Sequence, residues 1–116
     1  MPRTDSEVVM YIVVNSEIKV SPGKLAAQVA HSAVKASEEG RETECWEKWY
    51  CGSYTKIILK ASEFEMKQLM EKYFERVVFT RDEGRTEIQK GTLTTLAFIP
   101  LRKSEAPPEL AKLKLL

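Results

Sequence analysis

The feature that most constrains the fold is an unbroken run of apolar, mostly β-branched residues, Val8–Val14. A run of this kind is typical of a central strand that is covered on both faces. A short turn over 15–20 leads to a helix start, because Ser21 is a suitable N-cap and Pro22 suits the first helical position. A strand that leads through a short loop into a helix predicts the opening of an α/β layer.

The helix that begins at Pro22 has two different sides. Its polar stripe, at the helical period, comprises Lys24, Gln28, His31 and Lys35. The other side is apolar and rich in alanine, and it comprises Leu25, Ala26, Val29, Ala30, Ala33 and Ala36. Small side chains allow close packing, so the alanine side is expected to lie against the sheet. A lysine in the first turn is unfavourable beside the positive end of the helix dipole, so Lys24 and the free backbone amides predict an anion site.

The rest of the chain continues to alternate strands and helices. Ser62 and Glu65 form a capping box, which indicates a helix from there to about residue 74. The other predicted elements are a helix over 42–50, strands over 54–59, 77–80 and 92–99, a linker over 102–108 and a helical turn over 109–113. The order β-α-α-β-α-β-β predicts an α/β fold, with a mixed four-stranded sheet and helices on both faces. The loop over 81–91 is expected to join an antiparallel hairpin.

Length and composition narrow the class of protein. At 116 residues the chain is expected to form a single domain over 1–116, with residues 1–7 as a flexible tail. A net charge of +1 does not indicate a nucleic-acid binder, so any site for a polyanion would be a local cluster. No stretch approaches the roughly 20 apolar residues of a membrane span, and the chain is expected to be cytoplasmic. Two cysteines and one histidine predict neither a disulfide framework nor a zinc site.

The two tryptophans, Trp46 and Trp49, lie in the predicted second helix and allow two interpretations. They could form a platform on which a nucleic-acid base stacks. Large aromatic side chains at helical spacing are more often buried in a core, and burial is therefore the expectation.

Three sets of polar residues could carry chemistry: Lys24, Gln28 and His31 on the first helix, Asp82, Arg85 and Thr86 in the loop, and Thr92 and Thr94 on the last strand. If the loop folds over the amino end of the helix, Asp82 lies near Lys24. The carboxylate can then orient a water and the lysine can stabilise developing negative charge, which suits hydrolysis of an ester or amide without a covalent intermediate. The residues alone also allow a solvated lysine, an aspartate that shapes a turn and a histidine that only packs.

Two segments resemble a known family. Residues 22–31 are similar to the G-K-x-A-A-Q-x-x-H segment of the archaeal/eukaryotic-type peptidyl-tRNA hydrolases. Residues 82–86, followed by Gly91 and Thr94, are similar to that family's D-x-G-x-T…G…T segment. Residues 49–52 with Lys56 resemble its W-x-x-G…K region, and residues 113–115 resemble its C-terminal end. The similarity runs in the same order and spacing from about Val8 to Pro100.

The resemblance implies a mixed four-stranded sheet and hydrolysis of the ester that joins a peptide to the 3′ end of tRNA. It implies peptidyl-tRNA as the partner and, because members often form homodimers, a homodimer, with no cofactor or metal. By motif position the catalytic residues are Lys24, Asp82, Thr86 and Thr94, and Gln28 and His31 line the site. Candidates for contact with tRNA phosphates are Lys19, Lys35, Arg81, Arg85 and Lys90.

The residues also allow two other functions. One is a non-catalytic RNA-binding or protein-interaction module that uses the Lys24 pocket as a phosphate site. Another is hydrolysis of a different acylated small molecule. The sequence departs from the family where Ser21-Pro22 stands in place of a frequent Gly-Lys, Val20 in place of a methionine, Ser32 in place of an alanine and Glu87 in place of a glutamine.

Overall fold

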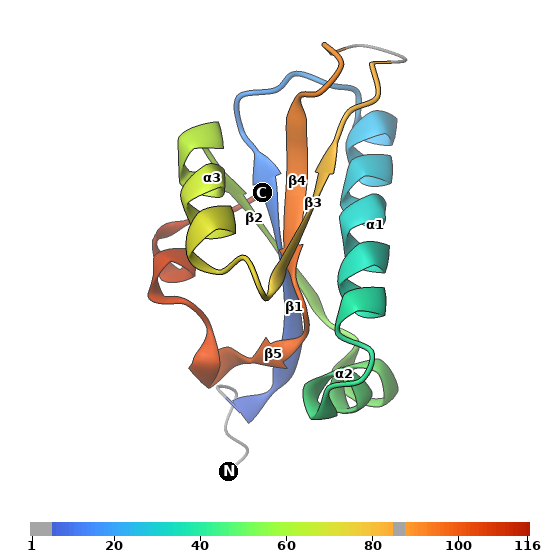
Figure 1. The fold of residues 1–116 in the computed structure, drawn as a ribbon, viewed down its shortest axis with the longest axis vertical. Helices are drawn as coiled ribbons and strands as arrows, with labels where there is room; N and C mark the ends of the chain where they lie inside the picture. The colour runs from blue at the N-terminus through green and yellow to red at the C-terminus, as the bar shows by residue number, and fades with distance from the viewer. Residues whose placement is uncertain (1–5, 85–87) are drawn as a thin grey trace.

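A computed structural model describes residues 6–84 and 88–116 (Figure 1). Its strands and helices are β1 (Val8–Asn15), α1 (Pro22–Glu39), α2 (Glu44–Lys48), β2 (Lys56–Ala61), α3 (Glu63–Lys72), β3 (Val77–Arg81), β4 (Leu93–Phe98), β5 (Leu101–Arg102) and β6 (Lys114–Leu115). A π-helical turn covers 49–53, and 3₁₀ turns cover 103–105 and 108–112. Among these residues, no helix combines the length and the hydropathy that crossing a membrane requires.

The strands form one mixed sheet in the order β3-β4-β1-β2-β6, and β5 pairs with the start of β1. β1 runs parallel to β2 and antiparallel to β4, and β3 and β4 form the predicted antiparallel hairpin. The α/β fold class is therefore confirmed. The sheet has six strands rather than the predicted four, because β5 and β6 lie in the segment after residue 100. Each is two residues long, too short to leave an alternating pattern in the sequence.

Helices cover both faces of the sheet, as Figure 1 shows with α1 on one side and α3 on the other. Alternate residues of β1 enter two different cores, because successive side chains of a strand point to opposite faces. Val13 packs in the core under α3, with Met66, Leu69, Leu96 and Phe98. Met10 and Ile12 pack in the core on the α1 side, with Ala36, Trp49 and Ala97. Burial on both faces explains why β1 is a continuous apolar run.

The prediction that α1 packs through its alanine side was correct only in part, because Ala36 is buried and Val29 and Ala33 pack against the same core. The buried residues of α1 are Gln28, Ser32 and Ala36, whereas Ala26 and Ala30 are exposed. Gln28 and Ser32 face the sheet because threonine hydroxyls on β3 and β4 satisfy their hydrogen bonds, so their burial leaves no unpaired polar group. His31 and Lys35 of the polar stripe are exposed. The helix start was predicted correctly, since the Ser21 hydroxyl accepts the backbone N–H of Lys24 at 3.2 Å.

The expectation that the tryptophans are buried is confirmed for Trp49 and only in part for Trp46. Trp49 is 1% exposed, and its indole N–H donates to the backbone oxygen of Thr55 at 2.8 Å. Trp46 is half-buried, and the Tyr50 ring stacks on it with ring centroids 4.7 Å apart. One face of Trp46 is therefore already occupied by a side chain of the same segment.

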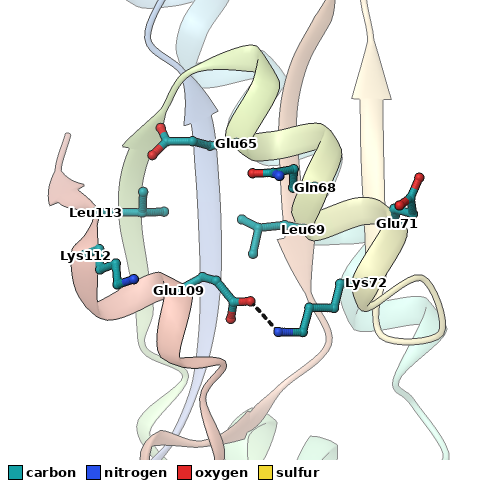
Figure 2. Close-up of a pocket in the computed structure, with 8 residues that line it drawn as sticks. All are labelled: Glu65, Gln68, Leu69, Glu71, Lys72, Glu109, Lys112 and Leu113. Atoms are coloured by element: carbon teal, nitrogen blue, oxygen red, sulfur yellow. Dashed lines mark hydrogen bonds and ion pairs between the residues drawn. The ribbon is translucent and has the colours of Figure 1, made fainter.

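The C-terminal turn is fastened to α3 by a carboxylate, at the hollow drawn in Figure 2. Glu109 accepts from the Lys72 ammonium and from the Tyr73 hydroxyl, each at 2.7 Å. The hydrogen bonds from Lys72 and then Tyr73 lower the pKa of Glu109 to about 2. The predicted capping box at the start of the same helix is also present, with reciprocal bonds between Ser62 and Glu65.

Replacement of Glu109 by glutamine should lower the free energy of unfolding at pH 7 by less than about 1 kcal/mol, because this ion pair is partly exposed. The folded-state pKa lies below the unfolded value of about 4.3, so the contribution is present above that value and is lost as the pH falls towards 2. Urea denaturation of the wild type and Glu109→Gln at several pH values should therefore show a difference that shrinks over this window. The exposed Glu71→Gln serves as the control, and an equal pH dependence for both variants would contradict the assignment.

Candidate active site

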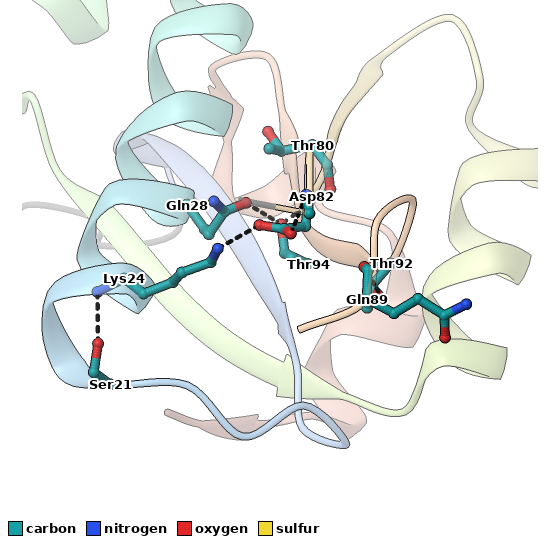
Figure 3. A network of polar contacts seen from close by, with 9 residues as sticks. Ser21, Lys24, Gln28, Thr80, Asp82, Gln89, Thr92 and Thr94 are labelled. Atoms are coloured by element: carbon teal, nitrogen blue, oxygen red, sulfur yellow. Dashed lines mark hydrogen bonds and ion pairs between the residues drawn. The ribbon is translucent and has the colours of Figure 1, made fainter. Parts of the chain in front are cut away.

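A buried ion pair lies at the amino end of α1 (Figure 3). Lys24 Nζ and Asp82 Oδ1 are 2.6 Å apart, and their side chains are only 11% and 3% exposed. Lys24 belongs to the first turn of α1, and Asp82 follows directly after β3. Asp82 therefore lies at the helix start, as expected if its loop folds back over that end of α1. The anion that Lys24 contacts is a side chain of the protein itself.

The position of Asp82 is fixed by backbone hydrogen bonds within the hairpin. Its N–H donates to Thr92 O at 2.8 Å, and its carbonyl accepts from the N–H of Gly91 at 2.7 Å. Oδ2 accepts from the N–H of Gly84 at 2.6 Å. Gly84 has a φ of +78°, and a Cβ there would lie 2.5 Å from the Lys90 Cβ. Only glycine fits this turn without strain, so Gly84 is part of what aims the carboxylate.

The surroundings of Asp82 favour its charged form. The hydrogen bond from Lys24 is the largest cause that lowers its pKa, and the Gly84 amide adds to it, while burial acts in the opposite direction. Asp82 is therefore ionised at neutral pH, and each of its oxygens already has one donor. A carboxylate oxygen accepts more than one hydrogen bond, so either can also accept from a water.

Gln28 and Thr94 lie beside the ion pair and contact each other (Figure 3). The Thr94 hydroxyl lies 2.6 Å from Gln28 Oε1 and 3.0 Å from the backbone oxygen of Thr80. Both partners are acceptors and the hydroxyl has one proton, so it donates to one of them at a time. Thr94 is fully buried and Gln28 is 7% exposed, which fixes the Gln28 side chain one helical turn from Lys24.

A second layer of hydroxyls, which sequence reasoning missed, lies beneath Gln28. Ser32 Oγ is 2.8 Å from both Thr80 Oγ1 and Thr95 Oγ1, and Thr95 donates to the backbone oxygen of Gln28 at 2.9 Å. All three hydroxyls are at most 5% exposed. The one signal in the sequence was Ser32 itself, a polar residue four positions after Gln28 and therefore on the same side of the helix. This network anchors the middle of α1 to β3 and β4.

The remaining predicted site residues are distributed around a hollow of about 900 Å³, whose lining includes Lys24, Gln28, His31, Lys35, Arg81 and Asp82. His31 is exposed, and within the described ranges 6–84 and 88–116 no carboxylate is paired with it. Lys35 Nζ donates to Phe79 O at 2.9 Å, and Arg81 donates to Gly91 O at 3.1 Å.

Three of the predicted residues lie elsewhere, and two lie outside the described residues. Lys19 lines a separate hollow beside Leu25. Lys90 is exposed, directly before Gly91 in the sequence. Thr92 precedes β4, and its hydroxyl donates to Gln89 O at 2.7 Å, so it does not share the position of Thr94. Arg85 and Thr86, like residues 1–5 of the predicted tail, lie outside the described residues.

Residues 8–116 match the family described as "Peptidyl-tRNA hydrolase PTH2". The chain belongs to this family. A Peptidyl-tRNA hydrolase of Thermococcus onnurineus is 37% identical over 105 residues, which cover 85% of each chain. One of Thermococcus sibiricus is 41% identical over 77% of this chain and 80% of its own length. One of Saccharolobus islandicus is 35% identical over 94% of this chain and 99% of its own length. The resemblance inferred from the motifs at Lys24 and Asp82 is thereby confirmed.

Replacement of Ser32 by alanine should lower the free energy of unfolding by about 1–2 kcal/mol, because the buried hydroxyls of Thr80 and Thr95 each lose a partner. Urea denaturation measures this change. Ser104→Ala, on the exposed turn after β5, is the control and should change the stability by less than about 0.5 kcal/mol. Equal stabilities of the two variants would show that the hydroxyl network does not hold α1 to the sheet.

Proposed function

We propose that this protein is a peptidyl-tRNA hydrolase, which cleaves the ester between a peptide and the 3′ end of tRNA and releases free peptide and reusable tRNA. The observation that carries the proposal is the buried contact of 2.6 Å between Lys24 and Asp82, beside Gln28 and Thr94. Membership of the PTH2 family and the names of the curated relatives support the same reaction.

The proposed chemistry is direct attack by water. Ionised Asp82 accepts a hydrogen bond from the water and orients it towards the ester carbonyl. As the new carbon–oxygen bond forms, negative charge on the carbonyl oxygen is stabilised by the Lys24 ammonium and the first amides of α1. The bond from carbon to the ribose oxygen then breaks, and a proton from the attacking water ends on that ribose oxygen. Lys24, Asp82, Thr86 and Thr94 are the proposed catalytic residues, with Gln28 and His31 lining the site.

The Lys24–Asp82 contact also argues against the alternative of a simple phosphate site. The Asp82 carboxylate neutralises the Lys24 charge and would repel an incoming phosphate at that position. A binding module would have no use for a carboxylate there. A hydrolase needs one, because the carboxylate positions the water.

The proposal extends to the rest of the chain. Residues 1–116 act as one domain, in the cytoplasm where translation takes place. The tRNA phosphates are contacted by Lys19, Lys35, Arg81, Arg85 and Lys90. Lys35 and Arg81 support this proposal because both line the same hollow as the ion pair.

Release of peptide from N-acetyl-aminoacyl-tRNA tests the reaction. The wild type should turn over, and Lys24→Ala and Asp82→Asn should each lower kcat/KM about 100-fold or more, because each removes a group that acts in the transition state. His31→Ala should lose less, since this side chain is exposed at the rim. Lys48→Ala, at the end of α2 and outside the lining of the hollow, is the control. A folded wild type that binds the tRNA without cleaving it would contradict the proposed hydrolase activity and would support the RNA-binding module instead.

We further propose that the protein forms a homodimer through the side of α1 that faces away from the ion pair. Leu25, Val29 and Ala33 on the helix, with Ile12 and Ile58 on the sheet, line an apolar hollow of about 560 Å³. Lys56 is the one charged side chain among the described residues that line it. Contiguous apolar surface of this kind is typical of an interface, and a second copy would bury it.

Sedimentation velocity should give twice the chain mass of 13.3 kDa for the wild type. Val29→Glu should give a monomer, because the charge would have to be buried in the interface. Phe64→Glu introduces the same charge at a position that is 70% exposed on α3, and it should leave the mass unchanged. A monomeric wild type would exclude the dimer without affecting the proposed reaction.

A further inference from the structure

One row of residues crosses the whole sheet and ends in two lysines. Thr80 of β3 is opposite Thr95 of β4, Thr95 is opposite Val14 of β1, Val14 is beside Lys60 of β2, and Lys60 is opposite Lys114 of β6. Residues that pair directly point to the same face of a sheet. Because Thr80 and Thr95 contact Ser32 of α1, this is the α1 face. Both lysines are exposed on it.

This pairing of lysines is unfavourable in the free protein. Like charges directly opposite on neighbouring strands destabilise a sheet. In the ranges 6–84 and 88–116 no carboxylate lies within ion-pair distance of Lys60 or Lys114, whereas Lys48 and Lys103 are paired with glutamates. A local rule broken without evident gain is expected where function requires it.

Two further lysines extend the positive surface. Lys19 lines the hollow of about 430 Å³ next to Lys60, and Lys112 lines a neighbouring hollow together with Lys60 and Lys114. The second hollow also contains one carboxylate, Glu65. That carboxylate accepts the backbone N–H of Ser62 at 2.9 Å as part of the helix cap, so it is engaged within α3.

The spacing between strands sets the distance from these lysines to the reacting ester. Four strand intervals lie between β3 and β6, which at about 4.8 Å each place Lys114 about 19 Å across the sheet from Thr80. Phosphates follow one another at about 3.4 Å along a strand of a duplex. A nucleic acid whose 3′ end lies at Asp82 therefore reaches Lys60 and Lys114 with phosphates several nucleotides from the ester.

We infer that Lys60 and Lys114 form a second contact with the RNA backbone, which binds phosphates of the acceptor arm of tRNA. The inference rests on the proposed function, because it takes the ester at Lys24 and Asp82 as the fixed point. A phosphate between the two ammonium groups replaces their repulsion with two attractions. Protection of an exposed strand edge accounts for Lys114 alone, since Lys60 lies on a strand that β6 already covers at this register.

Steady-state hydrolysis of N-acetyl-aminoacyl-tRNA by Lys60→Gln/Lys114→Gln tests the inference. KM should rise about 10-fold at low salt with kcat within about twofold, and the slope of log KM against log salt should fall by about 1.5, the loss of two phosphate contacts. Lys48→Gln/Lys103→Gln removes the same charge at the other end of the molecule and should leave both quantities unchanged. On an N-acetyl-aminoacyl ester of adenosine, which lacks the phosphates, the test variant should match the wild type.

The possible failures are distinguishable. An active wild type whose KM and salt slope are equally insensitive to both double substitutions would overturn the RNA contact. If that test variant also forms larger assemblies, the lysines only protect the strand edge. A wild type that binds tRNA without hydrolysing it would refute the proposed function. In that case the tRNA affinities of the two double variants test the lysine contact separately. Equal affinities would refute the lysine contact as well. Thermal unfolding should show the test variant at least as stable as the wild type, since a like-charge pair has been removed.

Discussion

The contact between Lys24 and Asp82 is the interaction on which the rest of the site depends. Two charges this deeply buried are favourable only if their geometry is good and their remaining hydrogen bonds are satisfied. The hairpin meets this condition through hydrogen bonds from the backbone N–H groups of Gly84 and Gly91 to Asp82. The Ser21 cap accepts the backbone N–H of Lys24 and so fixes Lys24 in the first turn of α1. The same arrangement leaves an ionised carboxylate and an ammonium group adjacent at the mouth of a pocket, which is what hydrolysis by water requires.

The hydroxyl network explains how α1 holds this geometry along its length. Gln28 and Ser32 lie one turn apart and contact three threonines from two strands. A buried polar network of this kind is satisfied in one arrangement only, so it fixes the position of the helix on the sheet. The position of Lys24 is therefore fixed in part by contacts two turns further along the helix.

Much of the fold was predictable because its signals are local. The run Val8–Val14, the cap at Ser21 and the capping box at Ser62 each specify an element from neighbouring residues, and the structure contains all three. The buried side of α1 was not predictable in this way. The partners of Gln28 and Ser32 lie 48 to 67 residues away, and no periodicity within the helix reports on them. The proximity of Asp82 to Lys24 was predicted conditionally, because a polar loop with two glycines can fold over a helix start.

The orientation of α1 on the sheet determines what the protein presents to other molecules. If the whole alanine side had faced the sheet, Ala26 and Ala30 would be covered and Gln28 would lie in solvent. Because the hydroxyls hold Gln28 and Ser32 against the sheet, Leu25, Val29 and Ala33 are only half-buried and line a hollow beside β2. Further along the same face the row that begins with buried Thr80 ends with exposed Lys60 and Lys114. Burial of polar groups at the site thus leaves an apolar surface and a basic surface on this face. The first suits an apolar partner surface, and the second suits an anionic partner.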